Sequence, residues 1–204
     1  MKLYYSTGSC SMACVIAAEE LGLKIEMIEV SWNRNLKVAE LESVNPLGVA
    51  PALVLDSGEV LTQNAAILEY FAESKADSKL LPKAGTLERL RVISWLSFVA
   101  ADLHKAFVPA FLAESLTESE ETQRQITSYS QKTVKGYLEH IENALKTSKF
   151  VAGNQFSVAD CYLYVVLNWC EAIEVSFETY PLIKNYLSRV EDRPGVQRAM
   201  ALEN

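Results

Sequence analysis

The chain has 204 residues, half of them apolar, and a formal net charge of −7. This length fits one domain or two small ones, and the apolar content is enough for a sizeable core. The acidic balance excludes the basic face that a nucleic-acid-binding protein needs, and no cluster of Lys and Arg suited to anionic lipid occurs.

The cysteines and the chain start indicate a reducing compartment. The four cysteines include no CxxC pair and do not form a disulfide scaffold. The first ten residues lack the apolar run of a secretory signal. The longest apolar stretch, 161–170, is interrupted by Asn168 and is too short to span a bilayer. We therefore expect a cytoplasmic protein with no membrane partner.

The first 75 residues alternate between strand and helix patterns, which predicts a mixed sheet with helices on its faces. Gly22 ends the first helix, and a hairpin turn joins the last two strands. The expected strands span 3–5, 25–30, 52–55 and 60–62, and the expected helices span 12–21, 36–41 and 63–73.

The pattern then changes to helix alone. Residues 76–85 are typical of a linker, so the expected domains are 1–75 and an all-helical 86–204. The first long helix is expected to kink at Pro109, and the fourteen residues from 157 to 170 are apolar nearly all round, as in a buried central helix. The expected helices span 86–114, 118–145, 157–170, 181–190 and 195–202.

Cys10 lies where the first strand and a small-residue turn lead into the first helix. A helix start carries unpaired N–H groups and a partial positive charge, which stabilise a thiolate and lower its pKa. The position therefore predicts a reactive thiol, and the alternative is a small buried apolar residue. Cys14, one turn later on the same face, is expected to pack rather than to act as a second redox thiol.

Two further segments are candidate ligand contacts. Pro51 opens the third strand after Ala50, and X-Pro is the only common place for a cis peptide bond. A cis bond there frees the Ala50 backbone to pair with an extended peptide ligand, and a trans proline is the alternative. Thr62-Gln63-Asn64 opens a helix and can hold a carboxylate, and simple capping is the alternative.

Ser157 and Asp160 form the pattern of a capping box at the start of helix 157–170. Phe156 and Cys161 are placed as the accompanying hydrophobic staple. We expect this role to be structural.

Several common chemistries have no signature in this chain. His104, beside Lys105, is one of only two histidines, and no HExxH spacing occurs, so no metal is expected. Nucleotide-binding glycine loops and a GxSxG context are also missing.

Taken together, these features resemble the cytosolic glutathione transferase superfamily, and most of all its bacterial beta class. The likeness covers essentially the whole chain. It implies a thioredoxin-like α/β N-terminal domain and an all-α C-terminal helical bundle domain, the glutathione transferase fold. The segments that carry it are residues 1–13, Asn45-Pro46-Leu47-Gly48-Val49-Ala50-Pro51, Leu61-Thr62-Gln63-Asn64-Ala65-Ala66-Ile67, Leu103-His104-Lys105 and Ser157-Val158-Ala159-Asp160.

The resemblance implies that glutathione is the co-substrate. Pro51 would be the family's cis proline, and the Ala50 backbone would pair with the cysteinyl part of glutathione. Gln63 and Asn64 would hold the γ-glutamyl carboxylate. Cys10 would lie against the glutathione sulfur, where beta-class relatives can form a mixed disulfide.

The helical domain would complete the implied site. His104 would reach the glutathione from this domain. Asp102 would lie near the interface of a homodimer and face the partner's glutathione. Ser97 stands where the beta class often has an Asn near the thiol.

The chain departs from the family pattern at several positions. The usual acidic-plus-small pair is Gln63-Asn64, which changes the local charge, and Thr7 stands where the class typically has Pro. The loop before Asn45 is slightly shorter than in the family. The glutathione contact that a lysine of this loop makes in the family would therefore be made by one of three residues here. These are Arg34, Asn35 and Lys37.

The implied activity is conjugation of reduced glutathione to hydrophobic electrophiles, a detoxification reaction, together with redox exchange through Cys10. In conjugation, Tyr5, Cys10, Ser11 or His104 would donate a hydrogen bond to the glutathione thiolate. In thiol–disulfide exchange, Cys10 itself attacks a mixed disulfide. Tyr5 ranks below Cys10 because it precedes the turn by several residues.

The second substrate and the rival function remain open. The aromatic candidates for the electrophile pocket are Phe107, Phe111, Tyr164 and Trp169, although aromatics on apolar helix faces are more often core. The rival is a non-catalytic protein on the same scaffold, either a carrier of hydrophobic ligands or a regulator associated with RNA polymerase.

Overall fold

The computed structural model describes residues 1–31 and 39–203. Its four-stranded sheet has the order β2-β1-β3-β4, in which β1 is parallel to β2 and antiparallel to β3, and β3 is antiparallel to β4. The sheet is therefore mixed, as the sequence pattern predicts. The strands are β1 (Lys2–Tyr5), β2 (Glu26–Glu29), β3 (Ala52–Val54) and β4 (Val60–Thr62).

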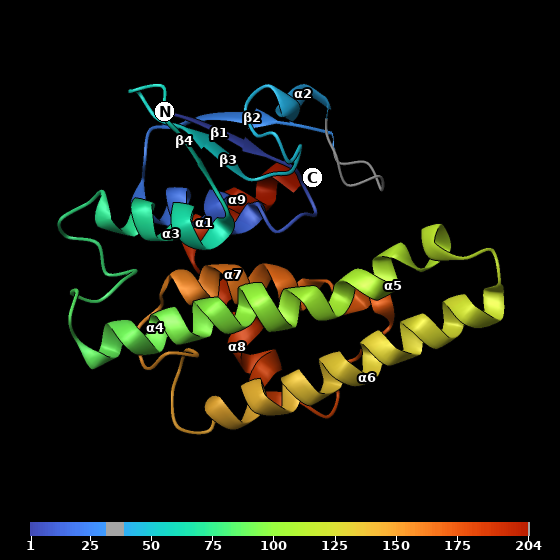
Figure 1. The fold of residues 1–204 in the computed structure, drawn as a ribbon. Helices are drawn as coiled ribbons and strands as arrows, with labels where there is room; N and C mark the ends of the chain where they lie inside the picture. Colours follow the sequence, from blue (N-terminus) through green and yellow to red (C-terminus); the bar gives the residue numbers. More distant parts are fainter. Residues whose placement is uncertain (32–38, 204) are drawn as a thin grey trace.

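Two helices cover one face of this sheet, α1 (Met12–Leu21) and α3 (Asn64–Glu73), and the short α2 (Ala39–Glu42) lies beside β2 (Figure 1). Leu3 pairs with Leu53 across β1 and β3, and both side chains are fully buried in the core that α1 and α3 share. Gly22 ends α1 with a φ of +58°, the left-handed conformation that glycine adopts easily.

From residue 86 onward the described chain forms helices joined by loops, and its only β-structure is an isolated β-bridge between Phe150 and Gly153. A π-helical segment, Val99–Leu103, joins the first two long helices, and 3-10 helices span Glu171–Ile173 and Ala201–Glu203. The α-helices are α4 (Leu87–Phe98), α5 (His104–Leu116), α6 (Glu120–Ala144), α7 (Val158–Asn168), α8 (Pro181–Glu191) and α9 (Pro194–Met200).

The first long helix holds an irregular segment that the sequence does not predict. α5 continues through Pro109, and the π-helical segment Val99–Leu103 lies earlier in the chain. A π-helical turn holds an extra residue and often occurs at functional sites. The π-helical segment ends directly before His104. It therefore determines the direction in which the His104 side chain leaves the helix.

The stretch 87–116 is long and apolar enough to cross a membrane, by length and composition alone. The core helix of a soluble protein satisfies the same criteria, so this observation is weak. In this structure α4 packs against α7, and α5 packs against α6.

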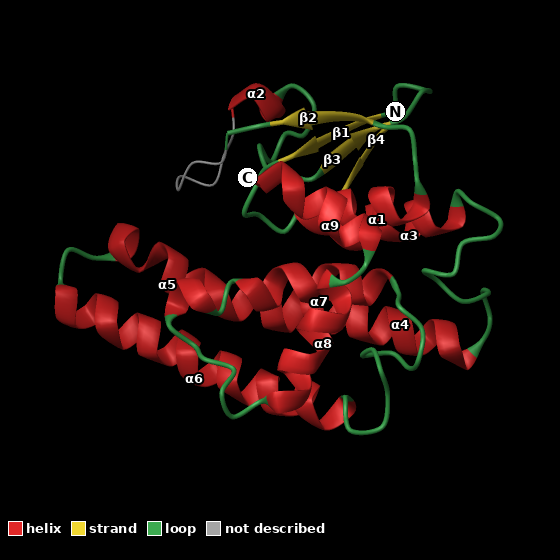
Figure 2. Cartoon of the chain, turned by 180° about the vertical axis from the view of Figure 1, so that it is seen from behind, coloured by secondary structure: helices red, strands yellow, loops and turns green. Residues whose placement is uncertain are grey.

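α7 occupies the centre of the molecule, as its apolar pattern predicts. Every residue from Val158 to Leu167 is buried. α7 contacts α1 and α3 on one side and α4 on the other, and it lies between them in both views (Figures 1 and 2). The core is thus continuous across the predicted division between 1–75 and 86–204, and that division stays a prediction.

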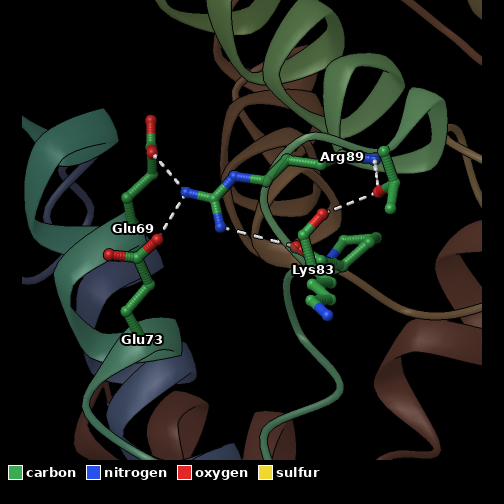
Figure 3. A network of polar contacts seen from close by, with 6 residues as sticks. Glu69, Glu73, Lys83 and Arg89 are labelled. Carbon is green, nitrogen blue, oxygen red and sulfur yellow. Dashed lines mark hydrogen bonds and ion pairs between the residues drawn. The ribbon is translucent and has the colours of Figure 1, made fainter.

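A second link between the two parts is polar. Arg89 on α4 forms ion pairs with Glu69 at 3.2 Å and Glu73 at 2.6 Å, both on α3 (Figure 3). Its guanidinium also donates to the Pro82 carbonyl at 3.4 Å. These contacts fix the start of α4 relative to α3.

Asp160 is fully buried and forms the expected capping box with Ser157. It accepts hydrogen bonds from the Ser157 N–H at 2.9 Å and the Ser157 hydroxyl at 2.7 Å. It also accepts from the Val151 N–H at 3.1 Å and the Tyr186 hydroxyl at 3.2 Å. The carboxylate thus ties the start of α7 to the preceding loop and to α8. Burial outweighs these bonds and raises the pKa of Asp160 to about 6.

We predict that Asp160→Ala lowers the free energy of unfolding by about 2 kcal/mol, because buried N–H groups lose their acceptor. The pKa of Asp160 is raised in the folded state, so its contribution is full at low pH and decreases as pH rises through about 6. Urea unfolding should therefore give a larger difference between wild type and Asp160→Ala at pH 4 than at pH 8. Equal differences at the two pH values would contradict this assignment.

α9 packs against α1 through charged side chains and a close backbone approach. Arg193 hydrogen-bonds to Glu20 and lies 4.0 Å from the Phe156 ring centroid, and Arg198 pairs with Glu19 at 2.7 Å. A Cβ on Gly195 would lie 2.8 Å from the Glu20 Cα. Only glycine allows the two helices to approach this closely.

Gly195→Ala should destabilise the protein by about 1–3 kcal/mol, because α9 must move away from α1. Gly136→Ala is the matched control, since nothing lies within 4 Å of a Cβ on that α6 residue. The control should stabilise the protein by about 0.5–1 kcal/mol through helix propensity. Denaturant unfolding of both variants tests the close packing, which is refuted if both are stabilised alike.

Candidate active site

One cavity of 1320 Å³ lies between the sheet domain and the helices. Its walls come from the β1–α1 loop, the segment before β3, the start of α3, and from α5, α6 and α7. Cys10, Ala50, Pro51, Gln63, Asn64 and His104 all line it, so most of the predicted site residues meet at one place.

Cys10 is half-buried in the β1–α1 loop, just before Ser11, the N-cap residue of α1. Serine hydrogen bonds hold this loop. The Ser6 N–H donates to the Ser11 hydroxyl at 2.9 Å, and the Ser6 carbonyl accepts from the Ser9 hydroxyl at 2.8 Å. The loop therefore presents the sulfur to the cavity from a fixed backbone.

The expected lowering of the Cys10 pKa is wrong for this structure. Burial raises the pKa of the thiol to about 11, and this effect outweighs the others. Hydrogen bonds from Asn64 and Tyr162 and the charge of Lys105 lower the pKa, but by less. The thiol is thus protonated at neutral pH.

Asn64 connects the start of α3 to the start of α1. Its side-chain amide donates to the Cys10 carbonyl at 2.9 Å, and its side-chain oxygen accepts from the Cys14 thiol at 3.0 Å. Gln63 is exposed and has a φ of +74°, and its side chain makes no capping hydrogen bond. No side-chain capping hydrogen bond is formed at the N-cap of α3, and the first residues of the helix, Asn64 and Ala65, line the cavity.

The Ala50–Pro51 peptide bond is cis, as the family resemblance implies, whereas the residues alone left the more common trans bond as the alternative. Both residues line the cavity, opposite the helical domain.

His104 and Tyr162 form a pair on the helical side of the cavity. The His104 Nδ1 lies 2.7 Å from the Tyr162 hydroxyl oxygen. Burial, with a smaller contribution from Lys105, lowers the pKa of His104 to about 4, so the ring is neutral at physiological pH. Tyr162 is 3% exposed, and burial raises its pKa, so its hydroxyl is protonated.

Tyr162 is the site residue that sequence reasoning missed. It lies in the apolar α7, where its ring looks like core, and its partner His104 is 58 residues away. The only available signal was general: a buried Tyr hydroxyl usually has a hydrogen-bond partner.

Trp169 connects the two sides of the site. Its indole N–H donates to the Gly8 carbonyl at 3.0 Å in the Cys10 loop. Its ring stands edge-on to His104, with centroids 4.8 Å apart. The Gly8 N–H also donates to the Glu203 carboxylate at 2.8 Å.

Other predicted site residues do not line the cavity. Tyr5 is 5% exposed in β1, so a catalytic role for it has no support. Ser97 on α4 and Asp102 in the π-helical segment are exposed away from the cavity. The candidates for the lysine contact lie outside the described residues, and they are Arg34, Asn35 and Lys37.

The aromatic candidates divide into two groups. Phe111 and Trp169 line the cavity. Phe107 is fully buried behind them, with its ring centroid 5.9 Å from that of Phe111, and Tyr164 is buried in the core. The expectation that Phe107 and Tyr164 line the pocket is therefore wrong.

Comparison with known proteins agrees with the geometry. Residues 7–74 match the family model of the glutathione S-transferase N-terminal domain, and residues 98–194 match that of the C-terminal domain. Glutathione S-transferase GstA from Escherichia coli O157:H7 is 34% identical over 100% of this chain and 98% of its own length.

Solved structures give the same result. A sphingomonad glutathione S-transferase complexed with glutathione is 38% identical, with a TM-score of 0.88 over 100% of this chain and 98% of that one. A bacterial beta class glutathione S-transferase from Sphingomonas chungbukensis is 40% identical, with a TM-score of 0.88 over 100% of this chain and 99% of that chain. These matches establish that the chain belongs to the glutathione S-transferase family, and it is similar to solved structures of the bacterial beta class.

Proposed function

We propose that this protein conjugates reduced glutathione to hydrophobic electrophiles and also exchanges thiols and disulfides through Cys10. The observation that carries the proposal is the shared cavity, in which Cys10, the cis-proline segment and the start of α3 face apolar helix residues. At 1320 Å³ it has room for two substrates side by side.

The glutathione half of the cavity suits an extended peptide. The Ala50 backbone offers hydrogen bonds to the cysteinyl part, and the uncapped start of α3 offers N–H groups to the γ-glutamyl carboxylate. The Asn64 side chain is already bonded to Cys10 and Cys14, so we assign the carboxylate contact to the backbone there. A sphingomonad relative that was solved with glutathione supports this ligand.

The electrophile half lies on the helical side. Val108, Phe111 and Leu112 of α5 and Trp169 after α7 give it an apolar wall beside the Cys10 loop. A hydrophobic electrophile held there would face the glutathione sulfur, which favours conjugation by proximity.

In the exchange reaction, Cys10 loses its proton to solvent, and its thiolate attacks one sulfur of a glutathione disulfide. A new Cys10–glutathione S–S bond forms as the old S–S bond breaks. Cys10 is oxidised, and the departing glutathione leaves as a thiolate that takes a proton from water. The raised Cys10 pKa makes the thiolate scarce at neutral pH, so this activity should increase with pH.

A homodimer in the cytoplasm is part of the proposal. Leu87 and Leu90 on α4 are 58% and 63% exposed, and a second copy would cover such residues. Asp102 is exposed close by in the chain, as its expected place near the interface requires.

A non-catalytic carrier or an RNA polymerase-associated regulator is the second candidate. Two observations favour it: Gln63 replaces the family's usual acidic residue, and burial raises the pKa of Cys10. A carrier needs the apolar half of the cavity but not the thiol.

Incubation with oxidised glutathione should give an adduct of one glutathione mass on wild type and none on Cys10→Ala, as measured by intact-mass spectrometry. Cys14, Cys161 and Cys170 are fully buried, so they should not react. Because the pKa of Cys10 is about 11, the adduct rate should increase about tenfold per pH unit between pH 7 and 9. An adduct that persists in Cys10→Ala, or none in wild type, would exclude exchange through Cys10.

Gln63→Glu should tighten glutathione binding about fivefold, because a carboxylate at this exposed position can pair with the γ-glutamyl ammonium group. Gln125→Glu on α6 is the matched control, since it adds the same charge on an exposed residue outside the cavity. Calorimetric titration of both variants measures the effect. Equal affinities would remove Gln63 from the glutathione site, and no binding by any variant would favour the carrier.

A further inference from the structure

The Tyr162 hydroxyl has three polar neighbours inside the cavity. His104 Nδ1 lies 2.7 Å away, and Cys10 and Asn64 line the same cavity, where each influences the pKa of Tyr162. The hydroxyl reaches this point from α7, while Cys10 and Asn64 belong to the sheet domain. Tyr162 therefore brings a hydroxyl group from the helical domain into the cavity that Cys10 lines, and this hydroxyl lowers the pKa of the thiol.

The hydroxyl has one proton to donate and two lone pairs that accept. The Asn64 amide, which already donates to the Cys10 carbonyl, lowers the pKa of Tyr162. The remaining question is whether the hydroxyl proton points to His104 or to the sulfur. A neutral imidazole can satisfy either arrangement, since one ring nitrogen donates and the other accepts.

We infer that Tyr162 is the hydrogen-bond donor to the reacting sulfur and that His104 is a positioning residue whose Nδ1–H donates to the Tyr162 oxygen. The inference rests on the proposed function only in taking the Cys10 sulfur as a reacting atom. No proton leaves the tyrosine: its hydroxyl stabilises the thiolate by a hydrogen bond alone.

The surroundings of His104 fit this positioning role. The Trp169 ring stands edge-on to the imidazole at an interplanar angle of 84°, and the Tyr162 ring does the same at 89°. These contacts fix the plane of the imidazole, so Nδ1 points at the hydroxyl oxygen. The indole is itself held through its hydrogen bond to the Gly8 carbonyl.

The groups that act on the Cys10 sulfur come from three helices. Lys105 of α5, Tyr162 of α7 and Asn64 of α3 each lower the pKa of the Cys10 thiol. Cys14 on α1 is fully buried, and burial raises its pKa, so it stays neutral. Removing the Tyr162 hydroxyl alone leaves the other contributions in place.

The test is the alkylation rate of Cys10 by iodoacetamide as a function of pH, with Cys10→Ala as the background. Below the thiol pKa this rate is proportional to the thiolate fraction. A hydrogen bond to a charged group is strong enough to shift a pKa by about one unit. Tyr162→Phe, which keeps the packed ring, should therefore slow alkylation about tenfold at pH 8.5. A faster rate would mean that the hydroxyl accepts from the thiol, and an unchanged rate would mean no contact; either refutes the inference.

His104 is tested with two variants of similar shape. Asn places its side-chain N–H where Nδ1 lies, whereas Leu has no donor there. His104→Leu should slow alkylation as Tyr162→Phe does, and His104→Asn should retain most of the wild-type rate. The double variant Tyr162→Phe with His104→Leu should be no slower than Tyr162→Phe alone, because His104 acts through the tyrosine. Additive effects, or equal rates for Asn and Leu, would overturn the positioning role.

This test is independent of glutathione. Slow alkylation in Tyr162→Phe together with no glutathione adduct on wild type would refute the proposed exchange but support the donor assignment. An adduct on wild type together with unchanged alkylation in Tyr162→Phe would support the exchange and refute the donor.

Discussion

The packing of α7 against α1 and α3 is the constraint on which the site depends. Cys10 and Asn64 lie at the starts of α1 and α3, and Tyr162 lies on the buried α7. They line one cavity only while the three helices share one core. The buried Asp160 carboxylate fixes the start of α7. This capping interaction, distant from the cavity, therefore determines the position of the Tyr162 hydroxyl.

Local patterns in the sequence were sufficient for much of the fold. Strand and helix periodicity gave the mixed sheet and the buried central helix, and a short-range motif gave the capping box at Ser157. Each of these features is determined by residues that are close together in the chain. The π-helical segment Val99–Leu103 was not predicted, because it holds an extra residue in the helix and no residue type marks a π-helical turn.

The chemistry of the site was less predictable, because it depends on tertiary burial. The helix start predicted a lowered pKa for Cys10, but the helical domain covers the thiol and raises the pKa to about 11. Tyr162 looked like core because its partner is distant in sequence. Tyr5 failed for the opposite reason: its position near Cys10 in the chain does not bring it into the cavity.

Burial of Cys10 has consequences for both proposed reactions. A thiolate with a high pKa is scarce but intrinsically more nucleophilic than one with a low pKa. The same burial strengthens any hydrogen bond that the thiolate receives, because water competes less. A neutral donor suits such a site, since a charged imidazolium would itself be disfavoured by burial. With the pKa of His104 near 4, the ring adds no charge beside the sulfur, and its part is to orient a hydroxyl that stays protonated at every pH at which the thiolate forms.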